Sequence, residues 1–336
     1  MRLVTFSVAT PLGAARRVGA QIGDGRIVDL AGAYAAHLEA RRLSSNAGGV
    51  AAALIPPDMV AFLDNGPVAL EAARQGLEFV RERLAGGKEA PTAPGDARIV
   101  FGPEEVRLLA PLPRPRTIRD FLCFEEHQRQ AMRALGRGSE IPEVWYQVPA
   151  YYKGNPSMVA GPDDDVVWPA YSQKFDYELE IAAVIGLRGQ DIPVGEADRY
   201  IAGYTVYNDF SARDTQVPEM QLGLGPGKAK DFEGSNAFGP VLVTPDEINV
   251  RDLAMTARIN GQVWSSGNSG TMYRTFADLI AHISRDETIY PGDVLGSGTV
   301  GSGSGLELDR WLQPGDTIEL EIAGIGVLRN RIVKPA

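Results

Sequence analysis

The sequence predicts a mainly β protein with some helix, built from a small α+β domain in residues 1–110 and a larger domain in residues 111–336. The length of 336 residues suits two domains better than one small core. Helix-forming composition is concentrated in the first hundred residues. Short β-rich runs between Gly, Pro and Asp turns fill most of the remainder, which favours a rolled or barrel-like sheet. Pro111, Pro113 and Pro115 predict a stiff connector at the boundary.

The first domain is expected to combine strands with helices. Residues 2–8 are β-rich, and residues 16–30 predict two strands joined by a hairpin at the Gly-Asp-Gly of residues 23–25. Ala, Leu, Arg and Glu dominate residues 31–42 and 67–85. These residue types favour helix, so we predict two helices there.

The second domain is expected to contain few helices. Residues 125–136 predict a helix that ends at Gly136, and residues 273–284 predict another with its apolar side chains on one face. Strands are predicted at residues 158–169, 177–186, 201–210, 239–244 and 255–264, and two more within residues 311–333.

Composition and charge exclude several classes of function. The formal net charge of −10 argues against nonspecific nucleic-acid binding, which needs clustered Lys and Arg, but leaves room for a local basic pocket. The sequence has no apolar run of about 18 residues that predicts a membrane span, and no apolar core typical of a signal peptide. The single cysteine, Cys123, rules out an intrachain disulfide and fits a reducing compartment. We therefore expect a cytoplasmic protein.

Two carboxylates, Glu178 and Glu180, stand inside the strand predicted at residues 177–186. Side chains at positions i and i+2 of a strand share a face, with Cα atoms roughly 6.5–7 Å apart. Two like charges at that spacing repel each other unless a cation, a proton or solvent relieves them. The pattern is therefore typical either of a metal site or of a solvated sheet face.

A second candidate carboxylate, Asp209, lies at the end of the strand predicted at residues 201–210. Strand ends often deliver functional carboxylates, although an ordinary turn aspartate gives the same pattern. With only three histidines in the chain, a His-rich metal site is excluded. Any metal site must therefore be rich in oxygen ligands, which suits Mg²⁺, Mn²⁺ or Ca²⁺.

The order of these motifs resembles the fumarylacetoacetate hydrolase family. Glu-x-Glu is followed by NDFSARDTQ, then by GKAKDF and FGP, and the chain closes with PGDTIELEIAGIGVLRNRI. The resemblance spans roughly residues 111–336. It implies the family's rolled, barrel-like catalytic domain and a homodimer. It also implies a small substrate that carries a carboxylate and an oxo group.

The same resemblance implies the metal ligands and the catalytic base. Glu178, Glu180 and Asp209 match the family's metal-binding carboxylates, and Asp120 matches a fourth ligand or a neighbour that acts through water. His127, seven residues after Asp120, matches the general base that activates water. Glu307 matches the residue that orients this histidine. Without the resemblance, His127 reads as a surface histidine on a polar helix.

Substrate contacts follow from the same comparison. Lys230 and Gln216 match groups that stabilise developing negative charge during catalysis. The substrate-binding positions are matched by Arg213, Tyr152 and Thr299. From the residues alone, Tyr152 also reads as a core residue, and Lys228 could take the place of Lys230.

Two residues depart from the family pattern, and one glycine-rich segment matches the motif of a different kind of site. Gly234 and Met220 stand where the fumarylacetoacetases have a threonine and a tyrosine, which bears on the substrate. GSGTVG, residues 296–301, satisfies the dinucleotide-binding fingerprint, which requires a following helix. We predict loop and strand after it, so its glycines are expected to let the backbone approach the substrate and to place Thr299.

Together these residues predict a hydrolase acting on carbon–carbon bonds in ketonic substances. The resemblance implies that a divalent metal, Mg²⁺ first, takes part in cleaving a 2,4-dioxo acid such as an acylpyruvate, in the catabolism of aromatic compounds. An alternative is decarboxylase, tautomerase or hydratase-type lyase activity at the same site. A third possibility is a protein without catalytic activity whose acidic strand binds a structural cation.

Overall fold

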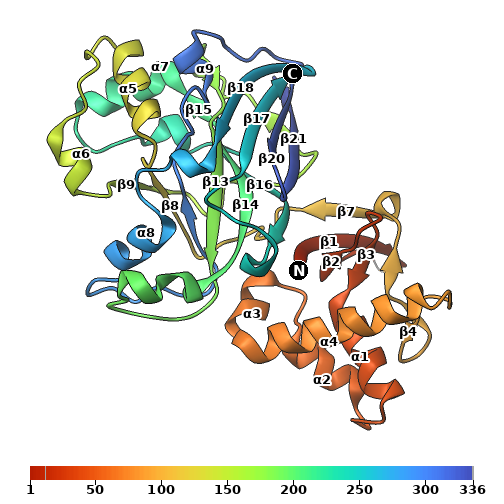
Figure 1. Ribbon diagram of the computed structural model, residues 1–336. Helices are drawn as coiled ribbons and strands as arrows, with labels where there is room; N and C mark the ends of the chain where they lie inside the picture. The colour runs from red at the N-terminus through yellow and green to blue at the C-terminus, as the bar shows by residue number, and fades with distance from the viewer. Residues whose placement is uncertain (12, 335–336) are drawn as a thin grey trace.

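The computed structural model describes residues 1–11 and 13–334 and contains two main β-sheets (Figure 1). The larger sheet has 12 strands, with β10 (Val159–Ala160) paired to β16 and β7 (Val106–Leu109) paired to β1. Its main path runs in the order β6 (Val100–Phe101), β3 (Ile27–Asp29), β2 (Gly13–Gln21), β1 (Arg2–Thr10), β16 (Asn236–Val243), β14 (Ile201–Asp209), β13 (Leu179–Ile185), β19 (Asp293–Gly296), β8 (Thr117–Phe121) and β9 (Tyr151–Gly154).

A five-stranded sheet packs against the larger one. Its order is β11 (Asp165–Val167), β21 (Gly326–Val333), β20 (Thr317–Ile322), β17 (Ala254–Ile259) and β18 (Gln262–Asn268). Two short strand pairs complete the β structure: β12 (Phe175–Asp176) with β15 (Ser211–Ala212), and β4 (Thr92–Ala93) with β5 (Ala97–Arg98).

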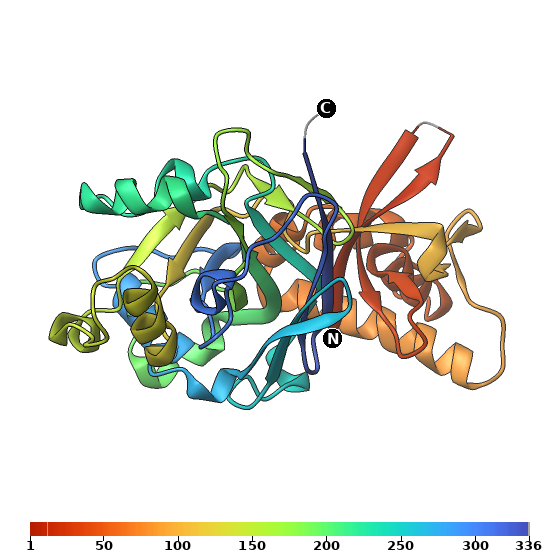
Figure 2. The ribbon, with the colours of Figure 1, turned by 90° about the horizontal axis from the view of Figure 1, so that it is seen from above.

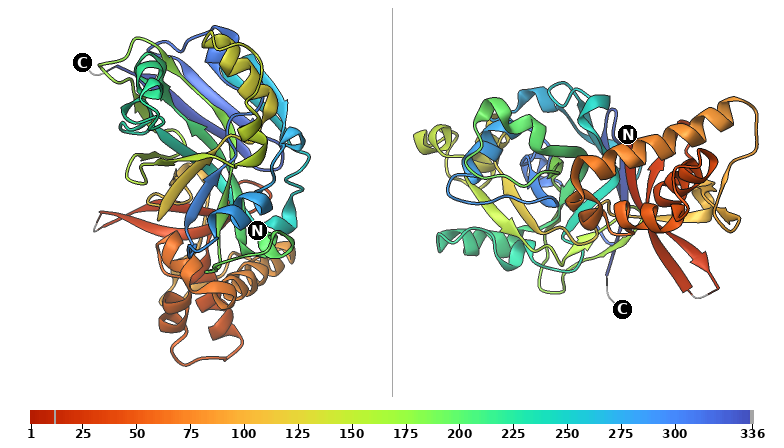
Figure 3. Two further views of the ribbon diagram at one scale, coloured as in Figure 1. Left: turned by 90° about the vertical axis from the view of Figure 1, so that its left-hand side faces the viewer. Right: turned by 90° about the horizontal axis from the view of Figure 1, so that it is seen from below.

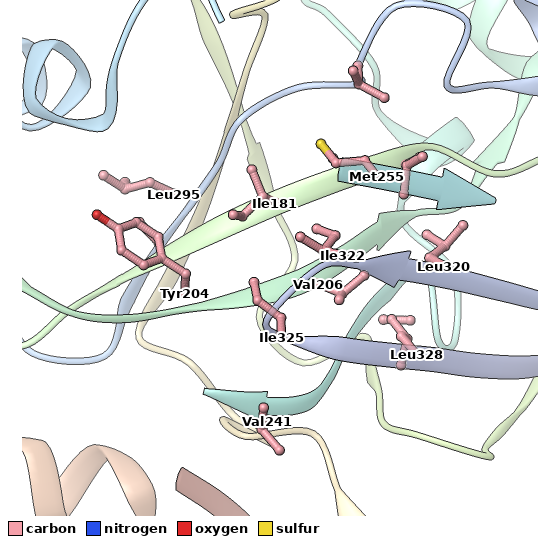
Figure 4. Packing of buried hydrophobic residues seen from close by; sticks show 14 of the residues in the cluster. Ile181, Tyr204, Val206, Val241, Met255, Leu295, Leu320, Ile322, Ile325 and Leu328 are labelled. Carbon is pink, nitrogen blue, oxygen red and sulfur yellow. The ribbon is translucent and has the colours of Figure 1, made fainter. Parts of the chain in front are cut away.

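The core of the larger domain lies between these two sheets. Figure 4 shows side chains of β13 and β14, such as Ile181 and Val206, facing Leu320 and Ile322 of β20, and all four are buried. The predicted mainly β fold is confirmed. The larger sheet is open, however, because β6 forms one edge and β9 the other. The fold is therefore a rolled sheet and not a closed barrel.

Four helices cover the N-terminal region: α1 (Leu30–Ala40), α2 (Ala47–Leu54), α3 (Met59–Asp64) and α4 (Gly66–Ala85). The predicted helices at 31–42 and 67–85 correspond to α1 and α4, and the predicted hairpin is the antiparallel pair β2–β3. Helices α2 and α3 were not predicted. Their signals were the cap residues Asn46 and Asp58, whose side chains accept hydrogen bonds from the first turn of each helix.

The larger sheet runs across the predicted domain boundary. Strand β1 pairs with β16 through Arg2↔Val243 and Leu3↔Leu242. The helices α1–α4 nevertheless gather at one end of the molecule, as both views of Figure 3 show. The division into residues 1–110 and 111–336 therefore stays a prediction, although one sheet is common to both parts.

Five helices belong to the C-terminal region: α5 (Glu125–Ala134), α6 (Glu143–Gln147), α7 (Arg213–Gln221), α8 (Phe276–Ile283) and α9 (Gly305–Leu308). The predicted helices at 125–136 and 273–284 correspond to α5 and α8. Helix α8 begins later than predicted because Thr275 and Asp278 form a capping box at its start. Helices α6 and α7 were not predicted, and α7 contains Pro218. Membrane-crossing helices are absent from the described residues, where none is both long and apolar enough.

We expect Leu320→Ala to lower the free energy of unfolding by about 2–5 kcal/mol, because it opens a cavity between the two sheets. Leu320 is fully buried, whereas Val327 on the neighbouring strand β21 is 40% exposed. Val327→Ala is the matched control and should change stability by no more than about 0.5 kcal/mol. Urea unfolding of both variants measures the difference. Equal losses would show that Leu320 is not part of a packed core.

Candidate active site

Four buried carboxylates meet at one end of the larger sheet. Glu180 comes from the start of β13 and Glu178 from the position just before it, Asp209 from the end of the adjacent β14, and Asp120 from the end of β8, which β19 separates from β13. Each offers one oxygen, and these oxygens all lie within 4.8 Å of one another. The antiparallel pairing of β13 with β14 explains the convergence, because the start of one strand lies beside the end of the other.

Burial distinguishes between the two interpretations of the glutamates. Glu178 is 4% exposed and Glu180 is fully buried, so they do not lie on a solvated sheet face. Leu179 between them packs into the hydrophobic core, as the alternation of a strand requires. The predicted side-by-side projection of the two carboxylates is confirmed.

Repulsion and burial shape the charge of this cluster. Burial, with the nearby charge of Asp209, raises the pKa of Asp120 to about 8. Burial, with the charges of Asp120 and Glu178, raises the pKa of Glu180 well above its usual range. Burial opposes ionisation of Glu178 too, but the Lys230 ammonium and the Arg213 guanidinium outweigh it and hold the pKa of Glu178 well below its usual range. The cluster therefore resists carrying all four charges without added positive charge.

The donor atoms fit a hard divalent cation. Asp209 Oδ1 is buried and has no hydrogen-bond partner within the described part of the chain, so a ligand position is open. Gly296 pairs with Asp120 across β19 and β8, and a Cβ at Gly296 would collide with the Asp120 carboxylate. An all-oxygen set of carboxylates is what Mg²⁺, Mn²⁺ and Ca²⁺ prefer.

Lys230 and Tyr152 both contact this cluster. The ammonium of Lys230, in the 3₁₀ turn η3 (Lys228–Lys230), donates to Glu178 and to Asp209. The hydroxyl of Tyr152 on β9 donates to Asp209 Oδ2 at 2.7 Å. Lys228 is exposed and donates to a backbone carbonyl outside the site. Of the two lysines considered for the site, Lys230 therefore contacts the carboxylates and Lys228 does not.

Arg213 joins the cluster to Asp176, which was not predicted as a site residue. Its guanidinium donates to Asp176 Oδ2 at 2.7 Å, to Glu178 Oε1 at 2.7 Å and to Gln216 Oε1 at 2.8 Å. Asp176 also accepts from the backbone nitrogens of Gly305 and Leu306 at the start of α9. It stands two positions before Glu178, so the alternation that revealed the two glutamates also contained the signal for Asp176.

A histidine–carboxylate pair lies beside the cluster. His127 Nδ1 on α5 lies 3.2 Å from Glu307 Oε1 on α9, an ion-pair contact without the geometry of a hydrogen bond. Glu307 is fixed by the backbone nitrogens of Ser302 and Ser304, both at 2.9 Å. Burial lowers the pKa of His127, but the Glu307 carboxylate outweighs burial, so the pKa lies above its usual value. The reading of His127 as a surface histidine is wrong, because the side chain is buried.

The glycine-rich segment 296–301 donates hydrogen bonds to two of the carboxylates. Gly298, at φ +77°, donates its backbone N–H to Glu180 Oε2 at 3.0 Å and to Asp120 Oδ1 at 3.2 Å. The hydroxyl of Thr299 donates to Glu180 Oε1 at 3.3 Å. The loop and strand predicted after this segment are wrong in one respect, because the single-turn helix α9 follows and carries Glu307.

A cavity of 390 Å³ opens onto the cluster between α5 and α7. It brings together nine of the predicted site residues: Asp120, His127, Tyr152, Glu178, Glu180, Arg213, Gln216, Lys230 and Thr299. Asp209 and Glu307 lie behind this wall, in contact with Tyr152 and His127. The geometry brings the predicted residues together, and their individual roles stay predictions. The apolar part of the wall was not predicted. It includes Ala131 and Met132 of α5, Leu135 just after that helix, and Val217 of α7.

Comparisons with known proteins found a matching family model and several relatives. The family model described as fumarylacetoacetate (FAA) hydrolase, C-terminal, matches residues 116–333. The chain is 33% identical over 283 residues to the rat (Rattus norvegicus) protein named oxaloacetate tautomerase Fahd2a, mitochondrial, covering 83% of this chain and 80% of that one. It is 30% identical to oxaloacetate tautomerase YisK of Bacillus subtilis, covering 83% and 87%. The solved fumarylacetoacetate hydrolase of Exiguobacterium antarcticum is 25% identical, with a TM-score of 0.67 over 99% of this chain and 100% of that one.

We expect Asp209→Asn to weaken Mn²⁺ binding by about tenfold or more, because a neutral amide replaces a buried anionic oxygen of the cluster. Titration calorimetry on metal-stripped protein measures the affinity. Glu126→Gln is the control, since Glu126 is exposed and bonds only to neighbours on its own helix. Unchanged Mn²⁺ affinity in Asp209→Asn would contradict a cation site at the cluster.

We expect Asp176→Ala to lower the free energy of unfolding by about 3–5 kcal/mol, because it removes one partner of a buried ion pair with Arg213. The control is Asp165→Ala, whose ion pair with Arg331 is exposed and should contribute far less. Urea unfolding compares the two variants. Similar small losses would show that Asp176 does not anchor Arg213.

Proposed function

Since this chain belongs to the fumarylacetoacetate hydrolase family, we propose that it is a metal-dependent enzyme that interconverts the keto and enol forms of a small 2-oxo acid of the oxaloacetate type. The observation that carries the proposal is the position of His127, which is paired with Glu307 and lines the same cavity as three carboxylates of the cluster. Tautomerisation needs a proton-transfer group beside a site that stabilises enolate charge. The names of the rat and Bacillus subtilis relatives support this reaction.

The carboxylates Glu178, Glu180, Asp209 and Asp120 would hold the divalent cation, which supplies Lewis-acid polarisation of the 2-oxo group. In the enolising direction His127 takes a proton from C3 and delivers it to the enolate oxygen. In the ketonising direction it takes the proton from the enol oxygen and returns it to C3. Because Nδ1 faces Glu307, Nε2 is left to exchange the proton.

The remaining residues bind and orient the substrate. The Lys230 ammonium stabilises the negative charge that develops on the enolate oxygen. The side-chain amide of Gln216 lines the cavity and binds the carboxylate of the substrate, while the hydroxyl of Thr299 donates to Glu180 and holds that carboxylate in place. Arg213 is held by Asp176 and Glu178, so it orients Gln216 and adds positive potential.

Hydrolysis of a carbon–carbon bond in a 2,4-dioxo acid is the second candidate, and one observation favours it. The buried His127–Glu307 pair is also suited to deprotonating water for attack on the carbonyl at C4. This reaction was the first expectation from the sequence. The aromatic catabolism, the cytoplasmic location and the homodimer predicted there stay predictions.

We expect metal-stripped protein supplied with Mg²⁺ or Mn²⁺ to accelerate the loss of enol absorbance from fresh oxaloacetate while total oxaloacetate stays constant. His127→Asn should slow this reaction by about 10²- to 10⁴-fold, because the proton-transfer group is lost. Glu126→Gln, the exposed neighbour, should react at the rate of the parent. Release of pyruvate and a carboxylic acid from acylpyruvates, with no effect on oxaloacetate enol, would instead establish the hydrolase.

A further inference from the structure

A second cavity, with a volume of 330 Å³, lies away from the carboxylate cluster. It is formed by the residues just before β17, those just after β18 and the start of α8. Among the described residues, none lines both this cavity and the active-site cavity. Figure 2 shows β17 and β18 on one side of the C-terminal region and α7, a wall of the active-site cavity, on the other. The volume suits a small-molecule ligand, since such pockets measure about 300–1,000 Å³.

One wall of the second cavity carries a tyrosine hydroxyl without a partner. Tyr204 on β14 is 5% exposed, and its ring centroid lies 5.6 Å from that of Phe276 on α8. In Figure 4 its ring extends away from Val206 and ends in the hydroxyl at the edge of the core. This hydroxyl forms no hydrogen bond with any residue that the structure describes. Buried tyrosine hydroxyls are normally paired, so a ligand group that accepts from Tyr204 is expected here.

Two opposite charges stand at the rim of the same cavity. Asp198, in the 3₁₀ turn η2 (Val194–Tyr200), and Arg251, before β17, are both exposed and both line it. Neither forms an ion pair, with the other or with a third residue, in the part of the chain that the structure describes. Burial and the charge of Asp198 raise the pKa of the Tyr204 hydroxyl, whereas Arg251 lowers it. At neutral pH the cavity therefore offers a hydroxyl donor, a cation and an anion.

The remaining walls supply apolar surface. Ile248, Val250 and Met272 are half-buried and line the cavity together with the ring of Phe276. A ligand with an apolar body would cover these side chains and gain the free energy of removing them from water. The ligand that fits has an apolar body and a head that carries both signs of charge.

We propose that the second cavity binds a small zwitterion with an apolar side chain, of the class of α-amino acids such as phenylalanine. The carboxylate accepts from the Arg251 guanidinium and the Tyr204 hydroxyl, and the ammonium donates to Asp198. The apolar side chain lies against Phe276. A simple carboxylate would be repelled by Asp198, and a simple amine would be repelled by Arg251. The proposal does not depend on the reaction at the carboxylate cluster.

Calorimetry on the full chain in the presence of Mg²⁺, with L-phenylalanine as the ligand, tests the proposal. We expect saturable binding at a single site. 3-Phenylpropanoate lacks the ammonium and L-phenylalanine amide lacks the carboxylate, so each should bind about tenfold or more weakly. Glycine should also bind at least about tenfold more weakly, because it buries no apolar side chain.

Matched variants locate the site. Tyr204→Phe removes only the hydroxyl and should weaken the binding of L-phenylalanine about tenfold. Tyr290→Phe is its control, because Tyr290 is 41% exposed and does not line the cavity. Asp198→Asn should bring L-phenylalanine and 3-phenylpropanoate to within about threefold of each other, since the partner of the ammonium is lost. Glu196→Gln, in the same turn but outside the cavity, should keep the difference of the parent.

Several results would overturn the proposal. Gln216→Ala, in the active-site cavity, should leave the affinity for L-phenylalanine unchanged, and a loss there would place the amino acid at the carboxylate cluster instead. Equal affinity of the parent for L-phenylalanine and 3-phenylpropanoate, or no binding of either, would also contradict it. If the parent binds neither and Arg251→Glu dissociates a dimer in sedimentation, a second copy of this chain covers the cavity.

Discussion

The mutual repulsion of four buried carboxylates is the constraint on which the rest of the site depends. Each strand end brings an anion into a region without solvent, where unpaired charge is costly. Lys230, Arg213 and the backbone N–H of Gly298 all point at these carboxylates. Asp176 is in turn needed to hold Arg213. The surrounding residues can therefore be understood as a shell that stabilises the anions and keeps oxygen atoms open to a cation.

The sequence revealed two carboxylates of this site by a local pattern and the more distant residues by the order of the motifs. Period-two alternation located Glu178 and Glu180, and the motif order that resembles the family added Asp209, His127 and Glu307. Asp176 was overlooked although the same alternation includes it, because it precedes the run of apolar residues that marks the strand. Helix α7 was hidden by Pro218, which argues against helix in local patterns but here lies within the helix.

The arrangement of the walls could not be predicted, because it depends on contacts between distant segments. The apolar faces of α5 and α7 are about 80 residues apart in the chain, and neither reads as part of a binding site by itself. Likewise, α9 carries Glu307 to His127 only because Asp176 and the serine donors fix the loop that leads to it. Local patterns predict which residues form strands and helices, but the packing of the sheets determines which side chains meet.

The pairing of β1 with β16 ties the N-terminal region to the site. Strand β16 lies between β1 and β14, and β14 ends at Asp209. A fragment that begins at residue 111 would lack β1, so the backbone groups around Leu242 and Val243 would form a bare sheet edge. Unpaired backbone groups at such an edge can form hydrogen bonds with the strands of other chains. The first strand therefore protects the larger domain against aggregation, and the N-terminal region contributes to solubility as well as to shape.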